Sequence, residues 1–175
     1  ARWSSAVLLD PDEQFLGSQI DCTSLAPYPD RLIQLMTRQD TARTRILRRR
    51  LQDVELEEFQ RLQAGDMLFI DSSHIAKTGS DVLHALFTIL PALAEGVWVH
   101  FHDIHSNFEY PREWVKEGRS WNESYFLRAF LMHNPDWSIE LHAASLAECA
   151  ADELLPRMPR IGSAVGGSLW LRQSA

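Results

Sequence analysis

Two short hydrophobic runs that end in acidic residues constrain the fold more than any other feature of the chain. They are "MLFID" at residues 67–71 and "GVWVHFHD" at residues 96–103. An uninterrupted apolar run of this length is typical of a central parallel strand, buried up to its carboxyl end. Because segments of helical periodicity separate the apolar runs, the sequence predicts an α/β fold with a doubly wound, mostly parallel sheet.

The other expected elements follow the same alternation. A final pair of β-runs after a helical segment predicts an antiparallel terminal strand. Ser80 or Thr78 is expected to cap the helix that follows the first of the two runs, and Gly65 is expected to end the helix before it. Strands are expected at residues 19–25, 44–51, 67–71, 94–103, 137–143 and 166–174, and helices at residues 4–15, from residue 30, and at 54–65, 81–93 and 121–134.

Composition bounds the size and the partners of the protein. The chain has 175 residues, of which 45% are hydrophobic and 23% charged, which predicts a single domain over residues 1–175. The net charge of −7 argues against a general nucleic-acid or anionic-membrane surface. A small-molecule partner is therefore expected, and a homo-oligomer is left open. Two cysteines without metal-like spacing, Cys22 and Cys149, favour a reducing cytoplasm.

Acids and imidazoles collect at the carboxyl ends of the two main runs. The first run continues into Asp71, Ser72, Ser73 and His74. In open parallel sheets, ligands bind beyond the carboxyl ends of the strands. The group therefore has a functional interpretation, as metal ligands or as a base with its orienting partner, and a structural one, as caps of the following turn.

In "VWVHFHDIH" the side chains alternate between the two faces of the expected strand. Trp98, His100 and His102 share one face, opposite Val99, Phe101 and Asp103. His100 is expected in the core, hydrogen-bonded and neutral. Asp103 lies at the strand end and is the best functional candidate, with His102 and His105 after it. An oxygen-rich set that includes Asp71 and Asp103 fits a magnesium-type ion better than zinc.

Two further segments have a functional and a structural interpretation. "TARTRILRRR", residues 41–50, contains five arginines that suit phosphate binding or, more commonly, a solvated edge strand. The aromatic-rich segment at residues 106–125 is interpreted as a lid over a substrate or as a surface segment held by buried aromatics.

Four phrases of the sequence resemble the class I S-adenosylmethionine-dependent methyltransferases, specifically methyltransferase family 24. They are "DMLFIDSSHIAKTGSDV", "GVWVHFHDI", "FEYPREWVKEGRSWNESYFLRAFL" and "GGSLWLR". The resemblance runs from about Ser4 to Arg172. It implies a Rossmann-like sheet of seven strands with the last strand antiparallel, and S-adenosylmethionine as cofactor.

The resemblance also implies cofactor positions, from which the chain departs twice. The family's first strand and glycine-rich loop would precede or overlap "ARWSS", where only Ser4 and Ser5 match the small polar residues after the loop. The chain is therefore expected to lack that strand and loop at its N-terminus. The family's ribose-binding acid corresponds to Ala26.

Three other positions agree with the family's cofactor site. Asp53 matches the acid near the adenine amino group. Asp71, with Ser72 beside it, matches the residue next to the methionine end of the cofactor.

The leading functional hypothesis is methyl transfer to an oxygen, or less readily a nitrogen, of a small molecule. His74 or His102 would be the base, with Asp71 and Asp103 orienting it or holding a divalent ion such as magnesium. A degenerate fold that acts as a binding or oligomerisation module is the alternative, because the glycine loop and the ribose acid are missing. A metal-dependent hydrolase built on Asp71, His74, His102 and Asp103 is the third hypothesis.

Overall fold

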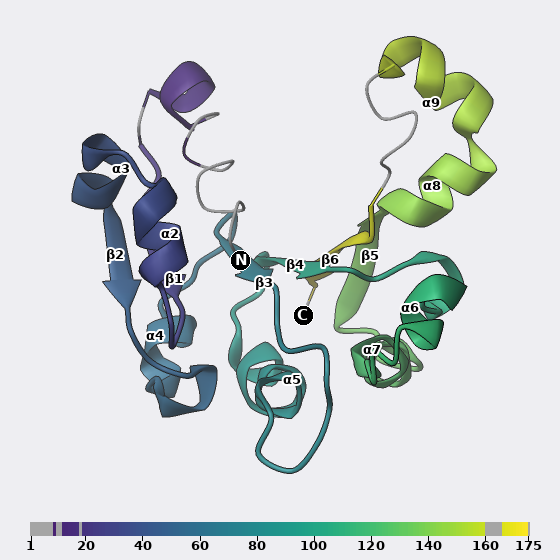
Figure 1. Ribbon diagram of the computed structural model, residues 1–175, viewed down its shortest axis with the longest axis horizontal. Coiled ribbons are helices and arrows are strands. Elements are labelled where there is room, and N and C mark those ends of the chain that lie inside the picture. Colours follow the sequence, from purple (N-terminus) through teal and green to yellow (C-terminus); the bar gives the residue numbers. More distant parts are fainter. Residues whose placement is uncertain (1–8, 10–11, 18, 160–165, 175) are drawn as a thin grey trace. The chain divides into compact units, whose positions relative to one another are not determined.

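The computed structural model describes residue 9 and residues 12–17, 19–159 and 166–174. Its contacts divide the chain into two compact units, residues 1–54 and 55–175, which are described separately below (Figure 1). That residues 1–175 form a single domain stays a prediction.

The first unit contains a two-stranded parallel sheet, in which Cys22 pairs with Thr44 and Leu25 with Leu47. Asp12 is fully buried and accepts hydrogen bonds from the backbone N–H groups of Gln19 and Ile20. The elements are η1 (Asp12–Leu16), β1 (Cys22–Leu25), α2 (Asp30–Leu35), α3 (Arg38–Arg43), β2 (Thr44–Leu47) and η2 (Leu51–Asp53). The predicted helix at residues 4–15 falls mainly outside the described residues.

Three arginines of the arginine-rich segment form ion pairs with acids of the same unit. Arg43 pairs with the buried Asp12, and Arg50 pairs with Asp53. Arg48, which is well exposed, pairs with Asp30. All three arginines flank β2 and do not lie within it, and both interpretations of the segment stay predictions.

The second unit is built on a four-stranded mixed sheet with the order β3-β4-β6-β5. β3 and β4 are parallel, whereas β6 is antiparallel to both β4 and β5, which confirms the expected antiparallel strand. The elements are α4 (Leu56–Gln60), β3 (Met67–Ile70), α5 (Asp81–His84), η3 (Ala85–Ile89), η4 (Leu90–Ala92), β4 (Trp98–His102), η5 (Ser106–Phe108), α6 (Arg112–Lys116), α7 (Glu123–Leu131), β5 (Trp137–His142), α8 (Ala143–Cys149), α9 (Ala151–Arg157) and β6 (Ser168–Gln173).

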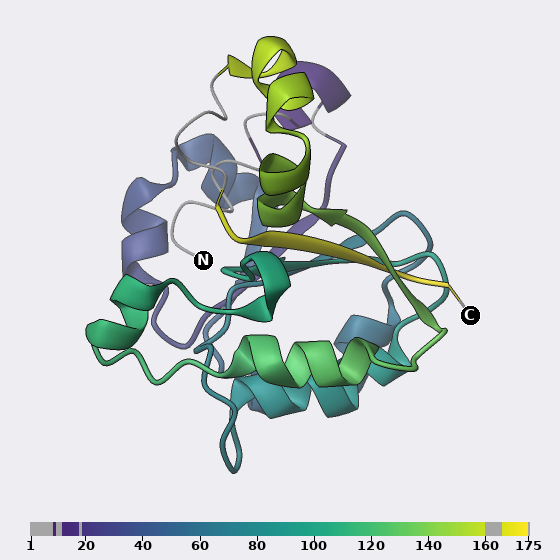
Figure 2. The same ribbon diagram turned by 90° about the vertical axis from the view of Figure 1, so that its right-hand side faces the viewer.

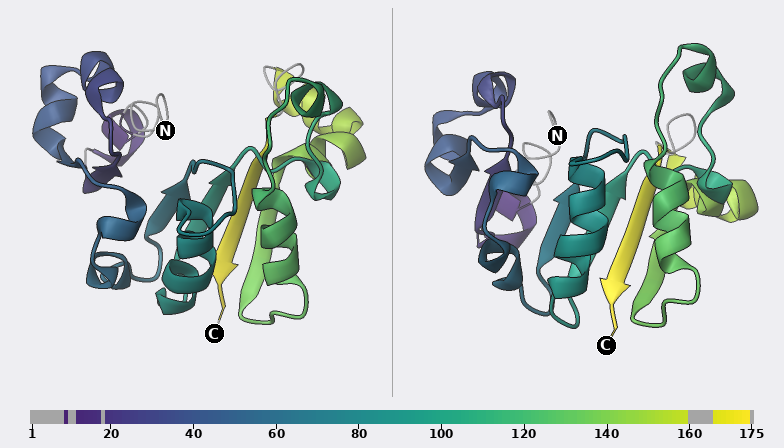
Figure 3. Two further views of the ribbon diagram at one scale, coloured as in Figure 1. Left: turned by 60° about the horizontal axis from the view of Figure 1, so that its bottom comes forward. Right: turned by 90° about the horizontal axis from the view of Figure 1, so that it is seen from below.

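Helices α5 and α7 lie side by side over one face of this sheet, and α8 lies toward the other face (Figures 2 and 3). The core is made of apolar side chains from the central strands and these helices. Those with no exposed surface include Val82, Leu86, Leu90, Val97, Val99, Phe101, Ile104, Leu127, Leu169 and Leu171. Ser80 caps α5 by accepting a hydrogen bond from the N–H of Leu83, as expected for one of the two proposed caps.

Two local predictions were wrong. The run at residues 67–71 is an edge strand of the four-stranded sheet, and Met67 is 42% exposed, because among the described strands only β4 pairs with β3. The helix expected to end at Gly65 ends at Gln60. Gly65, with a φ of 92°, instead donates its N–H to the carbonyl of Gly96 in a turn that starts the strand.

The mixed α/β architecture, with one parallel and one mixed sheet, is compatible with a Rossmann-like methyltransferase fold. The expected lack of a first strand and glycine-rich loop concerns a segment outside the described residues, so it stays a prediction. Within the described parts of the chain, no helix has the length and apolar character needed to cross a membrane.

Candidate active site

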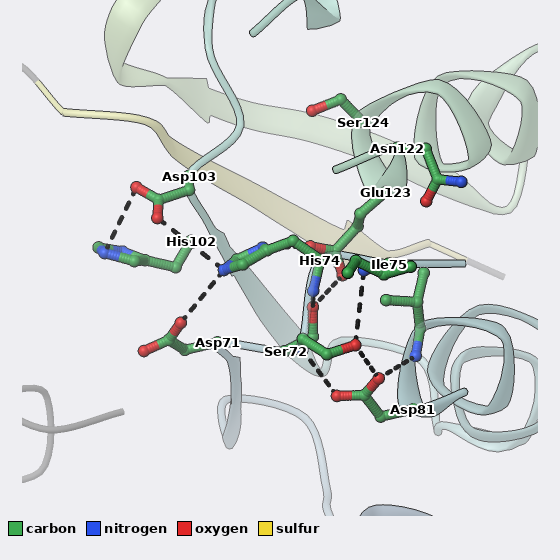
Figure 4. Close-up of polar contacts among 12 residues, drawn as sticks. Asp71, Ser72, His74, Ile75, Asp81, His102, Asp103, Asn122, Glu123 and Ser124 are labelled. Atoms are coloured by element: carbon green, nitrogen blue, oxygen red, sulfur yellow. Dashed lines mark hydrogen bonds and ion pairs between the residues drawn. The ribbon is translucent and has the colours of Figure 1, made fainter. Parts of the chain in front are cut away.

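The loop that follows β3 presents a buried histidine at the carboxyl end of the sheet (Figure 4). His74 is 5% exposed and has a φ of 59°, a conformation that a non-glycine residue adopts only when its surroundings hold it there. Its backbone N–H donates to the Ser72 hydroxyl at 2.8 Å. Its carbonyl accepts the N–H groups of Asn122 and Glu123, at the start of α7. The loop and α7 therefore hold the histidine together.

The Nδ1 side of the His74 ring faces a second buried group. Nδ1 lies 2.8 Å from Oε2 of Glu123, whose side chain is 1% exposed. The hydroxyl of Ser72 donates to the other carboxylate oxygen of Glu123, also at 2.8 Å. The ring of Trp121 packs on the imidazole with 4.1 Å between centroids. The ring is thus fixed by a carboxylate at its edge and an indole on its face.

The Nε2 side of the same ring faces two more accessible carboxylates. Nε2 is 3.5 Å from Oδ1 of Asp71 and 3.9 Å from Oδ2 of Asp103, and these acids are 19% and 23% exposed. Both acids follow neighbouring strands whose last pair is Ile70 with Phe101, so the parallel register brings them together. We call Asp71, Ser72, His74, Asp103 and Glu123 the edge cluster.

Asp103 is held in place by the chain segment that leads into β6. It has a φ of 61°. The N–H of Ile104, the next residue, donates to the carbonyl of Gly167 at 3.1 Å. A Cβ at Gly167 would lie 2.8 Å from the Cα of Asp103, so only glycine permits this approach. Gly167, the second glycine of "GG", therefore has a role in shaping the site.

The other histidines of "VWVHFHDIH" differ in surroundings. His102 is 44% exposed, and its Nε2 lies 3.7 Å from Oδ1 of Asp103. Burial lowers the pKa of His105, whose ring meets Trp114 edge-on at 5.0 Å. The site therefore offers two imidazoles next to Asp103, of which His74 is the buried and oriented one.

His100 is a core residue, as the alternation predicted. It is 3% exposed, stacks on Phe69 at 4.2 Å and packs on Trp170 at 4.7 Å. Its Nε2 is hydrogen-bonded to the hydroxyl of Ser168 at 2.7 Å. Burial lowers the pKa of His100 to about 4, so the ring is neutral at neutral pH.

The remaining predicted cofactor contacts belong to the first unit or lie outside the described residues. Ala26 follows β1 and donates its N–H to the carbonyl of Leu47. Asp53 accepts two hydrogen bonds of 2.8 Å from the guanidinium of Arg50, which lowers the pKa of the Asp53 carboxyl. Ser4 and Ser5 lie outside the described residues. Their roles and those of Ala26 and Asp53 stay predictions.

Across the described residues, no group of three or more histidine, cysteine, aspartate or glutamate side chains is arranged to hold a metal ion. At the predicted position, the Nε2 atom of His74 is a close neighbour of both Asp71 and Asp103. An imidazole flanked by carboxylates is an arrangement that can carry out acid–base chemistry.

The aromatic segment between β4 and α7 packs against the edge cluster through Trp121. Trp114 meets Trp121 edge-on at 5.1 Å, and the guanidinium of Arg119 lies over both rings. Tyr110 is nearly buried, and its hydroxyl accepts the N–H of Ser124. The segment covers the His74 ring, which fits the lid interpretation as well as that of a segment held by aromatics.

Sequence reasoning missed Glu123. An acid in the first turn of a helix usually interacts with the helix dipole at the surface, and nothing in "WNESY" distinguishes a buried acid from an exposed one. Its spatial neighbours, Ser72 and His74, are far from it in the sequence. The position of Glu123 beside His74 follows only from the packing of α7 against the loop after β3.

Comparison with known proteins agrees with the resemblance found in the sequence. The family model for a methyltransferase domain, family 24, matches residues 3–104, which include β1 to β4 and the residues Asp71, His74 and Asp103. Comparison with curated proteins finds no match. Because the family model covers more than half of the chain, the chain belongs to methyltransferase family 24, among the class I S-adenosylmethionine-dependent methyltransferases.

Proposed function

We propose that the protein transfers a methyl group from S-adenosylmethionine to an oxygen, or less readily a nitrogen, of a small-molecule acceptor, with His74 as the general base. One observation carries the proposal. His74 is held at Nδ1 by the buried Glu123, and its Nε2 faces the partly exposed Asp71 and Asp103 at the carboxyl ends of two parallel strands. Ligands of open α/β sheets bind at this edge.

The cofactor supplies an electrophilic methyl group on a sulfonium sulfur. For a hydroxyl acceptor, a new carbon–oxygen bond forms as the carbon–sulfur bond breaks, and the hydroxyl proton must leave. Nε2 of His74 accepts that proton. The carboxylates of Asp71 and Asp103 stabilise the imidazolium that results, since an opposite charge nearby favours the charged form. The proton then passes to water at the exposed edge, and the products are a methyl ether and S-adenosylhomocysteine.

The second unit fits one end of the cofactor. The Asp71 carboxylate follows β3 and is partly exposed, which suits the ammonium of the methionine moiety. Ser72 is part of the same proposal, although its hydroxyl already bonds with Glu123 and His74. Ser4, Ser5 and Asp53 complete the proposed cofactor contacts. With Ala26 in place of an acid, we expect cofactor binding to be weaker by about 1–3 kcal/mol.

A divalent ion such as magnesium, with Asp71 and Asp103 as ligands, is a separable part of the proposal. Carboxylate oxygens at a strand end are the ligands that such an ion prefers. Equal methyl transfer in the presence of EDTA and of added magnesium would remove this part and leave the general base in place. We also place the activity in the cytoplasm, where the unpaired thiols of Cys22 and Cys149 stay reduced.

The test separates cofactor binding from methyl transfer. Calorimetric titration with S-adenosylmethionine should show binding to the wild type and to His74→Asn alike. Transfer of a radiolabelled methyl group to a panel of phenols and glycosides should fall about 10²–10⁴-fold in His74→Asn. The change His102→Asn is the matched control and should have a smaller effect, because His102 is half-exposed and has no buried partner at Nδ1 among the described residues.

Three results would contradict the proposal. No detectable heat with S-adenosylmethionine would favour the degenerate binding module instead. Binding without transfer to any acceptor of the panel would also count against an enzyme. Unchanged transfer by His74→Asn would remove His74 as the base.

A further inference from the structure

We infer that Glu123 is the positioning residue of His74: it fixes the imidazole in the tautomer with the proton on Nδ1, which leaves the Nε2 lone pair facing Asp71 and Asp103. The inference deepens the proposed function and rests on the role of His74 as the base. The stretch of sequence that the family model matches ends at residue 104, so it does not include Glu123.

The side chain of Glu123 is almost fully buried. A carboxylate that is 1% exposed is strongly destabilising unless it is hydrogen-bonded. Among the described residues, its two oxygens contact the Ser72 hydroxyl and Nδ1 of His74, each at 2.8 Å. Both partners belong to the loop after β3, so the buried carboxylate of Glu123 interacts with this loop and its histidine and not with solvent.

The hydrogen bonds around Glu123 indicate which atoms carry the protons. The Ser72 oxygen accepts the backbone N–H of His74, and its single O–H donates to Oε1 of Glu123. An ionised carboxylate only accepts hydrogen bonds. With Glu123 as a carboxylate, Nδ1 of His74, 2.8 Å from Oε2, is the donor, and on this basis we assign the proton to Nδ1. In a neutral ring, Nε2 is then the unprotonated nitrogen, which is the atom that a general base needs.

The imidazole of His74 and the carboxylate of Glu123 belong to one hydrogen-bonded assembly. The carbonyl of His74 accepts the N–H groups of Asn122 and Glu123, so the main chain of the histidine is bonded to the main chain of its partner. The Asn122 side chain adds two hydrogen bonds to the backbone of Ala76. Trp121 covers the face of the ring. A ring flip would break the Glu123 contact without offering a replacement at that edge.

The test reads the tautomer directly. The full chain is labelled with ¹⁵N-histidine, and two-dimensional NMR distinguishes a protonated from an unprotonated ring nitrogen. The chain has seven histidines, so His74→Asn identifies the His74 signals by their loss. In the wild type we expect the proton on Nδ1 of His74. In Glu123→Gln, whose amide both donates and accepts, we expect the Nε2-protonated form to appear.

Kinetics provide the second readout. Glu123→Gln should lower kcat for methyl transfer by about 10²–10⁴-fold, as expected when an oriented base loses its tautomer, with KM for S-adenosylmethionine changed less than about twofold. The matched control is Glu140→Gln. Glu140 is exposed on β5 and also accepts a serine hydroxyl, that of Ser138 at 2.7 Å. Neither the His74 signals nor kcat should change in this variant.

A second variant covers the case in which Glu123→Gln does not fold, as judged by thermal unfolding. Ser72→Ala keeps the carboxylate and removes the hydroxyl that donates to Oε1 and accepts the backbone N–H of His74. It should give a mixture of tautomers and a smaller fall in kcat, of about 3- to 10-fold.

The outcomes distinguish the inference from the proposed function. A wild-type His74 protonated on Nε2, or a tautomer unchanged in both variants, would overturn the role of Glu123 even if His74 proves to be the base. If the tautomers are as expected but His74→Asn still transfers methyl groups at the full rate, His74 is not the base. Glu123 would then orient His74 without a role in catalysis.

Discussion

Two neighbouring regions of the second unit each contain a buried histidine, and their surroundings are opposite. His74, just beyond β3, has carboxylates at both ring nitrogens. His100, inside β4, lies against the rings of Phe69 and Trp170 and bonds only to a hydroxyl among the described residues. Burial alone therefore does not decide what an imidazole does. His74 has carboxylate neighbours, whereas burial lowers the pKa of His100 and keeps that ring neutral.

The largest expected effect is the difference in methyl transfer between substitutions of His74 and of His100, and its absence would contradict the comparison of the two histidines. His74→Asn should lower methyl transfer by about 10²–10⁴-fold, whereas His100→Gln should leave kcat within about threefold, because the buried His100 ring is hydrogen-bonded to Ser168 and to no described residue of the edge cluster. Both variants are assayed with the same acceptor. A loss of activity in His100→Gln that exceeds its loss of folded protein would contradict the division between an acid–base edge and an inert interior.

The second prediction concerns acid stability. In the unfolded chain His100 has an ordinary pKa of about 6.5, whereas burial lowers its pKa to about 4 in the folded protein. Between these pH values the unfolded state binds a proton that the folded state does not, so stability falls as the pH falls. The contribution is complete above pH ~6.5, and its loss reaches roughly 3 kcal/mol near pH 4.

Urea unfolding at a series of pH values measures this loss. His100→Gln, which cannot take up a proton at any of these pH values, should show a flatter dependence between pH 6.5 and 4. The same slope in the variant and the wild type would show that other groups cause the loss.

The third prediction tests whether Gly167 holds Asp103 in the edge cluster. Gly167→Ala places a Cβ 2.8 Å from the backbone of Asp103. We expect a loss of about 1–3 kcal/mol in the free energy of unfolding and a fall in kcat of about tenfold or more, as Asp103 is displaced from His74. Gly166→Ala is the control: its Cβ meets nothing within 4 Å, and its φ of 59° adds only local strain. Equal kcat values for the two variants would contradict the role given to Gly167.

The smallest expected effect lies at the junction of the loop and α7. Asn122→Ala removes two hydrogen bonds to Ala76, of 2.6 and 3.2 Å. We expect a loss of about 1–2 kcal/mol in stability, and faster hydrogen exchange at the amide of Ala76 than in the wild type. Unchanged protection of that amide would show that the loop is held by other contacts.

The sequence predicted most of the second unit because its signals are local. Apolar runs and alternation placed β3, β4 and β6 and assigned His100 to the core, and a capping serine placed the start of α5. The parallel register of β3 and β4 then follows from the fold class, so Asp71 and Asp103 could be expected at one edge.

The parts that could not be predicted depend on contacts between distant segments. Glu123 has the sequence context of an ordinary helix start, and only packing makes it a partner of His74. The exposure of Met67 depends on which strand pairs with β3, which the run of apolar residues does not encode. Gly167 is needed because of the backbone of Asp103, which no pattern within "GGSLWLR" indicates.

The position of β6 has a consequence for the order in which the protein folds. Among the described strands, β4 and β5 do not pair with each other, and each pairs with β6. A sheet whose central pairings join such distant residues has a high contact order and forms slowly. During synthesis, β5 has no strand to pair with until residues 168–173 have left the ribosome. Until then the backbone of Ile139 and Leu141 lacks its partners Leu171 and Trp170, and this open strand edge can misassemble or bind a chaperone.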